Sequence, residues 1–206
     1  MNKIIICFTI VSFLVFSCNT KNNNEIATSS TAKSIDAVKS ETKTIQPEKT
    51  DRILIGPKIE GDFDGDGKDE FAIITQTKQG EGNPVEDGTP DEYTISFSNK
   101  KLKPITIGCC EAQLINEGDL NQDGKDDFSV YQAPMNGTVY EMTTYSHQNS
   151  NWKQIVETFL IPTAHKELNN EELQKRVFLE NNTLYIFKED PNDENYKLIK
   201  KKIELN

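Results

Sequence analysis

Residues 61–73 read GDFDGDGKDEFAI, and residues 118–130 read GDLNQDGKDDFSV. Counted from the first aspartate of each stretch, carboxylate or amide side chains occupy positions 1, 3, 5 and 9, and glycine occupies position 6. Oxygen donors at alternate positions, with a glycine that permits a sharp turn, are how a loop wraps around Ca²⁺. A solvated acidic loop would need neither the glycine nor the repetition, and its carboxylates would repel one another without a cation. The pattern therefore predicts two calcium loops.

The residues that follow each loop distinguish it from an EF-hand. An EF-hand needs a bidentate glutamate at position 12 and helices on both sides. Here position 12 is Ile73 in the first stretch and Val130 in the second. The runs from position 9 onward, EFAIIT and DFSVY, are rich in β-branched and aromatic residues, which favour strands. Each loop is therefore predicted to lead into a β-strand.

The pattern D-x-[DN]-x-D-G-x-x-[DE] before a short apolar strand resembles the calcium loop of FG-GAP and VCBS-type repeats. These repeats occur in integrin-like β-propellers and in many exported bacterial proteins. The resemblance implies that the side chains at positions 1, 3, 5 and 9 and the carbonyl at position 7 bind the metal. These residues are Asp62, Asp64, Asp66, Lys68 and Glu70 in the first loop and Asp119, Asn121, Asp123, Lys125 and Asp127 in the second. Glu70 departs from the usual aspartate, and Asp69 or Asp126 at position 8 is the alternative ligand.

The two stretches lie 57 residues apart, and 7 of their 13 residues are identical. A fixed period of this size indicates a repeated supersecondary unit. Each copy contains four segments of strand-like composition separated by turn residues, as in the four antiparallel strands of a propeller blade. The predicted strands are 55–63, 69–77, 91–99 and 102–108 in the first copy, and 112–120, 126–134, 138–146 and 152–160 in the second.

Closed propellers need at least about four blades, and this chain provides two. We therefore expect an all-β fold in which repeats at about 53–108 and 111–162 form two blade-like sheets stacked face to face, an incomplete propeller. Residues 166–176 are expected to form one or two helical turns, and a C-terminal hairpin over 177–206 is expected to cap the sheets. The turn at 190–195 imitates the acidic loops but lacks the glycine, so we expect a plain turn.

Residues 4–16 form an apolar stretch that is shorter than the roughly 20 residues needed to cross a bilayer, which predicts a signal peptide over 1–17. The run into Ser17 and Cys18 resembles a bacterial lipoprotein signal. The resemblance implies lipidation of Cys18 and a membrane anchor in the cell envelope, in the periplasm or at the cell surface. Phe16 departs from that family's small residue, and ordinary secretory cleavage is the alternative. Residues 18–50 have no apolar period and are expected to be a disordered tether before a folded domain over 51–206.

The charge of the predicted domain favours cations. From residue 51 onward there are 29 acidic and 17 basic side chains, a net charge of −12, which repels nucleic acid and anionic lipid. The clustered acids are assigned to metal, and no separate acid–base pair is visible. The sequence therefore favours a non-enzymatic binding, adhesion or envelope scaffold module with a protein or glycan partner. The alternative is an envelope hydrolase acting on glycans or phosphoesters.

Other candidate sites are weaker. Cys109 and Cys110 are expected to be buried thiols, because a disulfide between neighbours is strained and zinc would need further ligands. His147 and His165 are predicted to lie at the surface. Core packing explains the remaining aromatic residues better than a glycan-stacking surface does; these residues are Tyr131, Tyr140, Tyr145 and Trp152.

Overall fold

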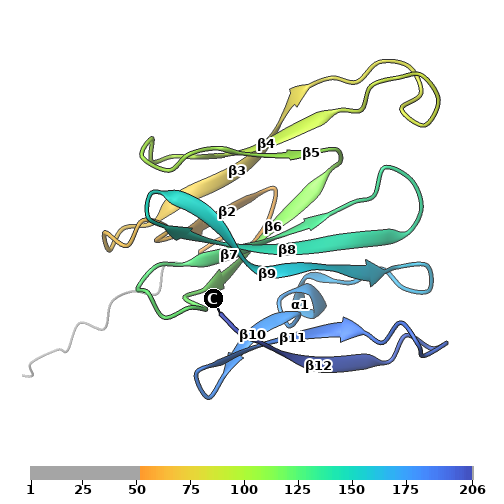
Figure 1. Cartoon of the computed structure of the whole chain (residues 1–206). Helices are drawn as coiled ribbons and strands as arrows, with labels where there is room; N and C mark the ends of the chain where they lie inside the picture. Colours follow the sequence, from red (N-terminus) through yellow and green to blue (C-terminus); the bar gives the residue numbers. More distant parts are fainter. Residues whose placement is uncertain (1–51, 206) are drawn as a thin grey trace, which may run out of the picture. The chain divides into compact units, whose positions relative to one another are not determined.

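The computed structural model describes residues 52–205. The predicted signal peptide, the lipidation site Cys18 and the tether lie outside the described residues. Within 52–205 the chain forms 12 β-strands and one four-residue helix, and every strand pairing is antiparallel. The strands form three open sheets, which appear in Figure 1 as three layers from top to bottom. The all-β prediction is confirmed.

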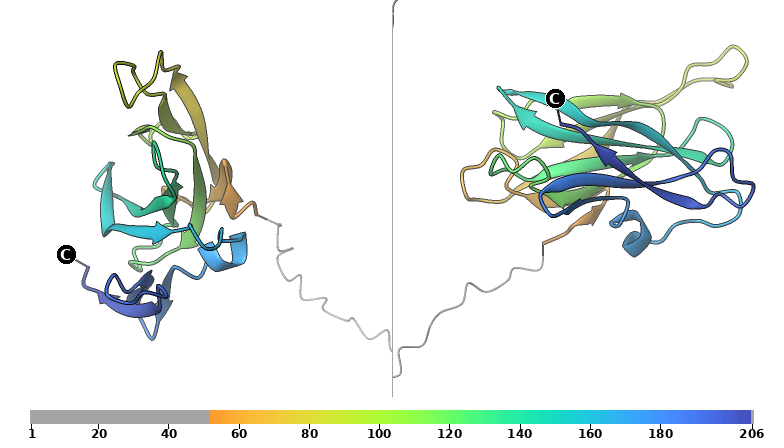
Figure 2. Two further views of the ribbon diagram at one scale, coloured as in Figure 1. Left: turned by 90° about the vertical axis from the view of Figure 1, so that its right-hand side faces the viewer. Right: turned by 60° about the horizontal axis from the view of Figure 1, so that its bottom comes forward.

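The first sheet is a meander of four strands, each paired with the next. It contains β2 (Lys58–Gly61), β3 (Glu70–Lys78), β4 (Glu92–Phe97) and β5 (Ile105–Gly108). The first acidic loop is the connection between β2 and β3. The long connection between β3 and β4 projects beyond the sheet, as the yellow-green loop in Figures 1 and 2 shows.

The second sheet repeats this meander and adds a fifth strand. Its order is β1 (Ile55–Gly56), β6 (Ala112–Gly118), β7 (Asp127–Gln132), β8 (Val139–Gln148) and β9 (Asn151–Pro162). The second acidic loop connects β6 to β7, the same position as in the first sheet. Each loop therefore joins the first two strands of a four-stranded meander.

The predicted first strand, 55–63, is wrong as a single element. Ile55 pairs with Ile115 in the second sheet, whereas Lys58 pairs with Ile73 in the first. Pro57 separates the two halves, and because proline has no amide hydrogen it interrupts a ladder. One short stretch of chain therefore contributes a strand to each of the two sheets.

The third sheet consists of β10 (Val177–Glu180), β11 (Thr183–Glu189) and β12 (Leu198–Ile203) in that order. It follows helix α1 (Asn170–Leu173), which is shorter than the predicted 166–176 segment. The Asn169 side chain caps the helix by accepting from the Glu172 amide at 3.0 Å, and the Glu172 carboxylate accepts from the Asn169 amide at 3.1 Å, a capping box. The third sheet is thus a hairpin extended by one strand.

Two apolar cores hold the sheets together, one on each face of the second sheet. The core between the first and second sheets contains Ile59, Phe63, Ala72, Ile95, Leu102, Leu114, Phe128 and Val130. The core between the second and third sheets contains Ile115, Leu120, Tyr131, Met142, Val156, Phe159, Ile161, Leu173, Val177, Leu184 and Ile186. Neighbours in β6 point to opposite faces, so Leu114 enters one core and Ile115 the other. The second sheet is the middle layer.

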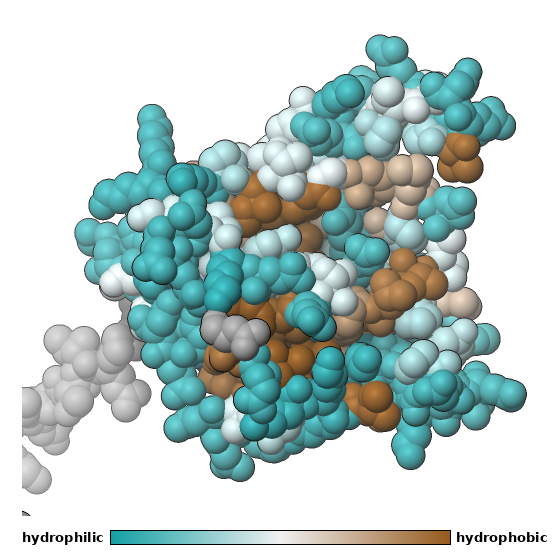
Figure 3. All heavy atoms as spheres, in the orientation of Figure 1, coloured by the Kyte–Doolittle hydropathy of each residue, from teal (hydrophilic) through white to brown (hydrophobic). Residues whose placement is uncertain are grey.

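The face of the molecule shown in Figure 3 is mainly hydrophilic. On the face shown in Figure 3, hydrophobic residues gather in separate groups surrounded by hydrophilic ones. No helix among residues 52–205 has the length and apolar character needed to cross a membrane.

Candidate metal centre

The first loop gathers three of its predicted ligands. Carboxylate oxygens of Asp62, Asp64 and Glu70 all lie within 4.8 Å of one another. Glu70 is only 7% exposed because it begins β3 at the edge of the apolar core. Asp66 is exposed at the tip of the loop. The three clustered residues are at positions 1, 3 and 9, so the structure brings the two ends of the loop together.

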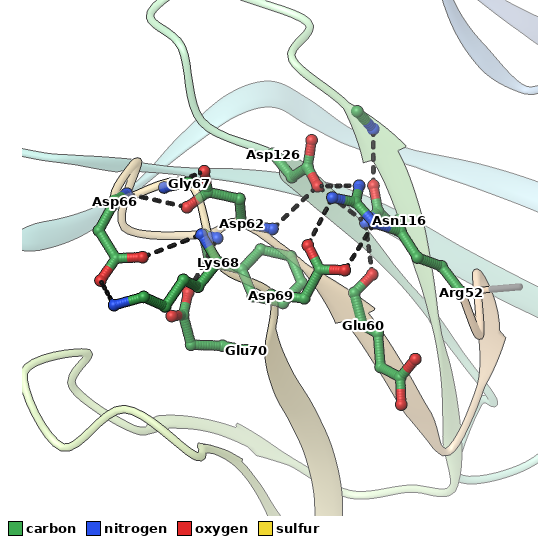
Figure 4. A network of polar contacts seen from close by, with 12 residues as sticks. Arg52, Glu60, Asp62, Asp66, Gly67, Lys68, Asp69, Glu70, Asn116 and Asp126 are labelled. Carbon is green, nitrogen blue, oxygen red and sulfur yellow. Dashed lines mark hydrogen bonds and ion pairs between the residues drawn. The ribbon is translucent and has the colours of Figure 1, made fainter. Parts of the chain in front are cut away.

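Backbone amides shape this loop around the first carboxylate. Asp62 Oδ1 accepts from the amides of Gly65 at 2.8 Å and Asp66 at 3.0 Å, and its Oδ2 accepts from Gly67 at 2.9 Å. Gly67 has a φ of 83°, a conformation that glycine adopts without strain. Figure 4 shows Asp62 enclosed by the turn it holds. The glycine at position 6 therefore has the role predicted for it.

Two further contacts fix the other clustered acids. Asp64 Oδ2 accepts from the Asn99 side chain at 2.7 Å, and Glu70 Oε2 accepts from the Phe63 amide at 3.1 Å. Burial raises the pKa of Glu70, and the charge of Asp64 raises it further. The raised pKa means that the negative charge of ionised Glu70 is disfavoured at this site. A bound cation would compensate that charge.

The second loop repeats the geometry at the equivalent positions. Asp119 accepts from the amides of Asp123 and Gly124, both at 2.9 Å, and Gly124 has a φ of 84°. Gln122, equivalent to Gly65 in the first loop, also has a positive φ, of 61°. The two loops thus share a backbone conformation although one left-handed position is a glycine and the other a glutamine.

Asp127, at position 9, carries the least satisfied carboxylate of the second loop. Its side chain is fully buried, and Oδ2 accepts from the amides of Leu120 at 3.0 Å and Asn121 at 3.3 Å. Oδ1 is buried and has no hydrogen-bond partner. Burial raises the pKa of Asp127 to about 7, although the Ser146 hydroxyl and the Leu120 amide lower it.

A neighbouring acid on β6 was not predicted from the sequence. Glu117 Oε1 is also buried without a partner. Burial raises the pKa of Glu117 to about 8, with a further contribution from the charge of Asp127. Glu117 lies two residues before Asp119, outside positions 1 to 9 of the ligand pattern. The pattern therefore gave no reason to include it.

The loops differ at position 3. The Asn121 amide nitrogen donates to Ser146 Oγ at 2.7 Å, whereas its equivalent, Asp64, accepts from Asn99. Within residues 52–205, Asp119, Asp123 and Asp127 do not form a close group of three carboxylates as the first loop does. The second loop therefore offers a looser set of charged oxygens.

The lysines at position 7 were predicted to contribute carbonyls. In the structure, the backbone amide of each lysine donates to the carboxylate at position 5. Lys68 donates to Asp66 at 3.0 Å, and Lys125 donates to Asp123 at 3.1 Å. The Lys125 ammonium also lies 3.1 Å from Asp123 Oδ2. Asp123 is thus partly neutralised by its own loop.

The position 8 acids, kept open as alternative ligands, make other contacts. Arg52 donates to Asp69 Oδ2 at 2.8 Å through Nε and to Asp126 Oδ2 at 3.0 Å through Nη1. In Figure 4 the guanidinium group lies between the two carboxylates. Asp69 and Asp126 are therefore ion-paired to one arginine and join the two repeats.

Three other expectations concern the two cysteines, His147 and the aromatic residues. Cys109 and Cys110 form a disulfide, so the expectation of free thiols is wrong. His147 is not a free surface residue, because both ring nitrogens are buried without partners and the ring lies 5.0 Å from that of Trp152. The aromatic residues pack against one another as expected, with Trp152 stacked on Phe97 at 4.7 Å.

Comparisons with known proteins identify no relative of this chain. No protein-family model, no curated protein and no solved structure matches it.

Proposed function

We propose that this protein is a calcium-binding, non-enzymatic scaffold or binding module of the bacterial cell envelope, with one Ca²⁺ in each acidic loop. Two meanders with the same loop between their first two strands support an origin in FG-GAP or VCBS-type, blade-like repeats. Export and a lipid anchor at Cys18 are proposed from the sequence alone. The partner would be a protein or a glycan.

The observation that carries the metal proposal is a pair of buried carboxyl oxygens without hydrogen-bond partners, together with the close group of acids in the first loop. Asp127 Oδ1 and Glu117 Oε1 are buried and have no hydrogen-bond partner within normal geometry, although the hydroxyls of Ser146 and Ser129 are near enough to lower the pKa of the two carboxyls. Buried polar groups normally have partners, because an unsatisfied one costs about 1–3 kcal/mol. A cation would satisfy these oxygens and relieve the repulsion among Asp62, Asp64 and Glu70. Hard oxygen donors of this kind suit Ca²⁺.

The rival to a cation is a proton on each buried carboxyl, and metal analysis separates the two. We expect two Ca²⁺ per chain by calorimetric titration, one after Asp62→Ala and one after Asp119→Ala. Asp87→Ala removes one carboxylate from the long exposed loop and is the matched control. Titrations of the unaltered protein that show no binding would mean that protons neutralise these carboxyls.

The partner is tested separately from the metal. Affinity capture from envelope extracts with and without Ca²⁺ distinguishes a calcium-dependent binding surface from a scaffold whose calcium is structural. Turnover of a glycan or phosphoester panel, abolished by a substitution outside the loops, would favour the hydrolase alternative.

A further inference from the structure

A cavity of about 460 Å³ lies between the end of β9, the segment that carries α1, and strands β11 and β12. Its volume is in the range of small-molecule sites. Most of its wall is apolar or aromatic, and this part is formed by Pro162, His165, Leu168, Phe187, Tyr196 and Leu198. None of its lining residues belongs to the acidic loops.

One residue of the cavity wall, Glu189, carries a buried acceptor without a partner. Arg176 and Glu189 form an ion pair at 2.8 Å, and their side chains are only 6% and 9% exposed. Arg176 also donates to the Phe187 carbonyl at 3.3 Å. Glu189 Oε1 receives the arginine, but Oε2 is buried and accepts no hydrogen bond. The wall of the cavity therefore has one acceptor without a donor.

The charges around the cavity favour an uncharged occupant. Arg176 neutralises Glu189, Lys166 contacts Glu172, and Lys175 lies 2.6 Å from Glu171. A cationic ligand at Glu189 Oε2 would also meet Arg176, and an anionic one would meet the unpaired oxygen. A neutral ligand with an O–H or N–H donor avoids both of these repulsions.

The walls favour a flat apolar body. The rings of His165 and Tyr196 lie 5.6 Å apart at 46°, and Tyr196 is 40% exposed. Its amide donates to the Asp193 carbonyl at 3.0 Å, which holds the turn that carries it. Aromatic rings prefer to pack against other rings and apolar side chains, and Leu168, Leu198 and Pro162 supply the apolar part.

We propose that this cavity binds a small, uncharged aromatic molecule with one O–H or N–H donor. The donor bonds Glu189 Oε2, and the ring packs between Tyr196 and the leucines. This site gives the module a ligand of its own, and it does not depend on the calcium loops. Failure of metal binding and failure of ligand binding are therefore separate results.

The test uses three probes on the full chain: 4-methylphenol, toluene, which lacks the donor, and methyl α-glucopyranoside. Amide shifts in a two-dimensional NMR titration locate binding and give the affinity. We expect 4-methylphenol to shift residues 162–176 and 187–198 saturably and to bind about tenfold more tightly than toluene, the worth of one hydrogen bond to a charged group. No saturable shift there, equal affinities for the two aromatic probes, or tighter binding of the glucoside would overturn the proposal.

Two variants separate the donor contact from the walls. Glu189→Gln should weaken the binding of 4-methylphenol about tenfold and leave the binding of toluene unchanged, because an amide NH2 group, a donor, then takes the place of the acceptor Oε2. It also leaves Arg176 without its charge partner, so Tyr196→Ala, at an exposed position, provides a second variant that should weaken both aromatic probes. Val85→Ala, 62% exposed in the long loop, is the control. Unchanged affinities in both cavity variants would overturn the proposed site.

Discussion

Asp62 and Asp126 join the two repeats by exchanging hydrogen bonds. The Asp126 amide donates to the Asp62 carbonyl at 2.8 Å, and the Asp62 amide donates to Asp126 Oδ2 at 3.0 Å. Asp62 is at position 1 of the first loop, and Asp126 lies next to Asp127 in the second. Arg52 strengthens the same junction. The backbones of the two loops are therefore in direct hydrogen-bonded contact.

This junction predicts that the two proposed metal sites are coupled. Asp126 is ion-paired to Arg52 and is not one of the residues at positions 1, 3, 5 and 9, yet Asp126→Ala should lower the Ca²⁺ affinity of both loops by about five- to tenfold, within the usual range of coupling energies. Calorimetric titration measures both affinities. Asp87→Ala makes the same charge change in the β3–β4 loop and should alter neither. An effect confined to the second loop would show that the contact does not couple the sites.

Chelation should lower the melting temperature. With free Ca²⁺ at about 100 times the dissociation constant, one site stabilises the fold by about 2.7 kcal/mol. For a chain of this size that corresponds to about 5–10 °C. Differential scanning calorimetry with EDTA or with Ca²⁺ gives the shift. Mg²⁺ is the control, because it needs a stricter octahedral site. Identical melting curves under all conditions would argue against structural calcium.

The second site should be weaker than the first, because Asn121 replaces a carboxylate and its amide nitrogen is held by Ser146. Asn121→Asp should raise the affinity of the second loop and Asp64→Asn should lower that of the first, each by about tenfold for one charge close to the metal. Titration of the two variants beside the unaltered protein measures this. Two equal sites in the unaltered protein would contradict the prediction.

The acidic loops were predictable because their information is local. Ligand spacing, the glycine at position 6 and the strand that follows are all contained in 13 residues. The junction between repeats was not predictable in this way. Arg52 lies ten residues before Asp62 in a segment without periodicity, and only the packed sheets bring it to Asp126, 74 residues away.

Two expectations that the structure corrects concern the segment around Pro57 and the pair Cys109 and Cys110. Pro57 separates β1 from β2, but the assignment of the two halves to different sheets depends on the tertiary pairing of Ile55 with Ile115. Cys109 and Cys110 lie between β5 and β6 and form a disulfide, whereas the usual apolar packing of free cysteine predicted buried thiols.

Gly61 lies where the two repeats pack closely, so a substitution there tests how tightly they are joined. It is buried at the end of β2, and a Cβ added there would lie 2.8 Å from Asp126 Oδ2 and closer still to the Asn116 side chain. Asn116 donates to the Glu60 carbonyl at 2.7 Å and accepts from the Gly118 amide at 2.7 Å, so it has little freedom to move away. Gly61→Ala should therefore lower the free energy of unfolding by about 1–3 kcal/mol, as overpacking does.

The equivalent glycine of the second repeat is the matched control for this prediction. Gly118 has a φ of 70° and no atom within 4 Å of an added Cβ, so Gly118→Ala meets backbone strain without a clash. Its cost should be about 1–2 kcal/mol, and Gly118→Asn should recover part of it because asparagine tolerates this conformation. Gly61→Asn should recover nothing, because the crowding remains. Urea unfolding of the four variants in EDTA measures the comparison without metal. Recovery at Gly61 and not at Gly118 would mean that the inter-repeat junction is loosely packed.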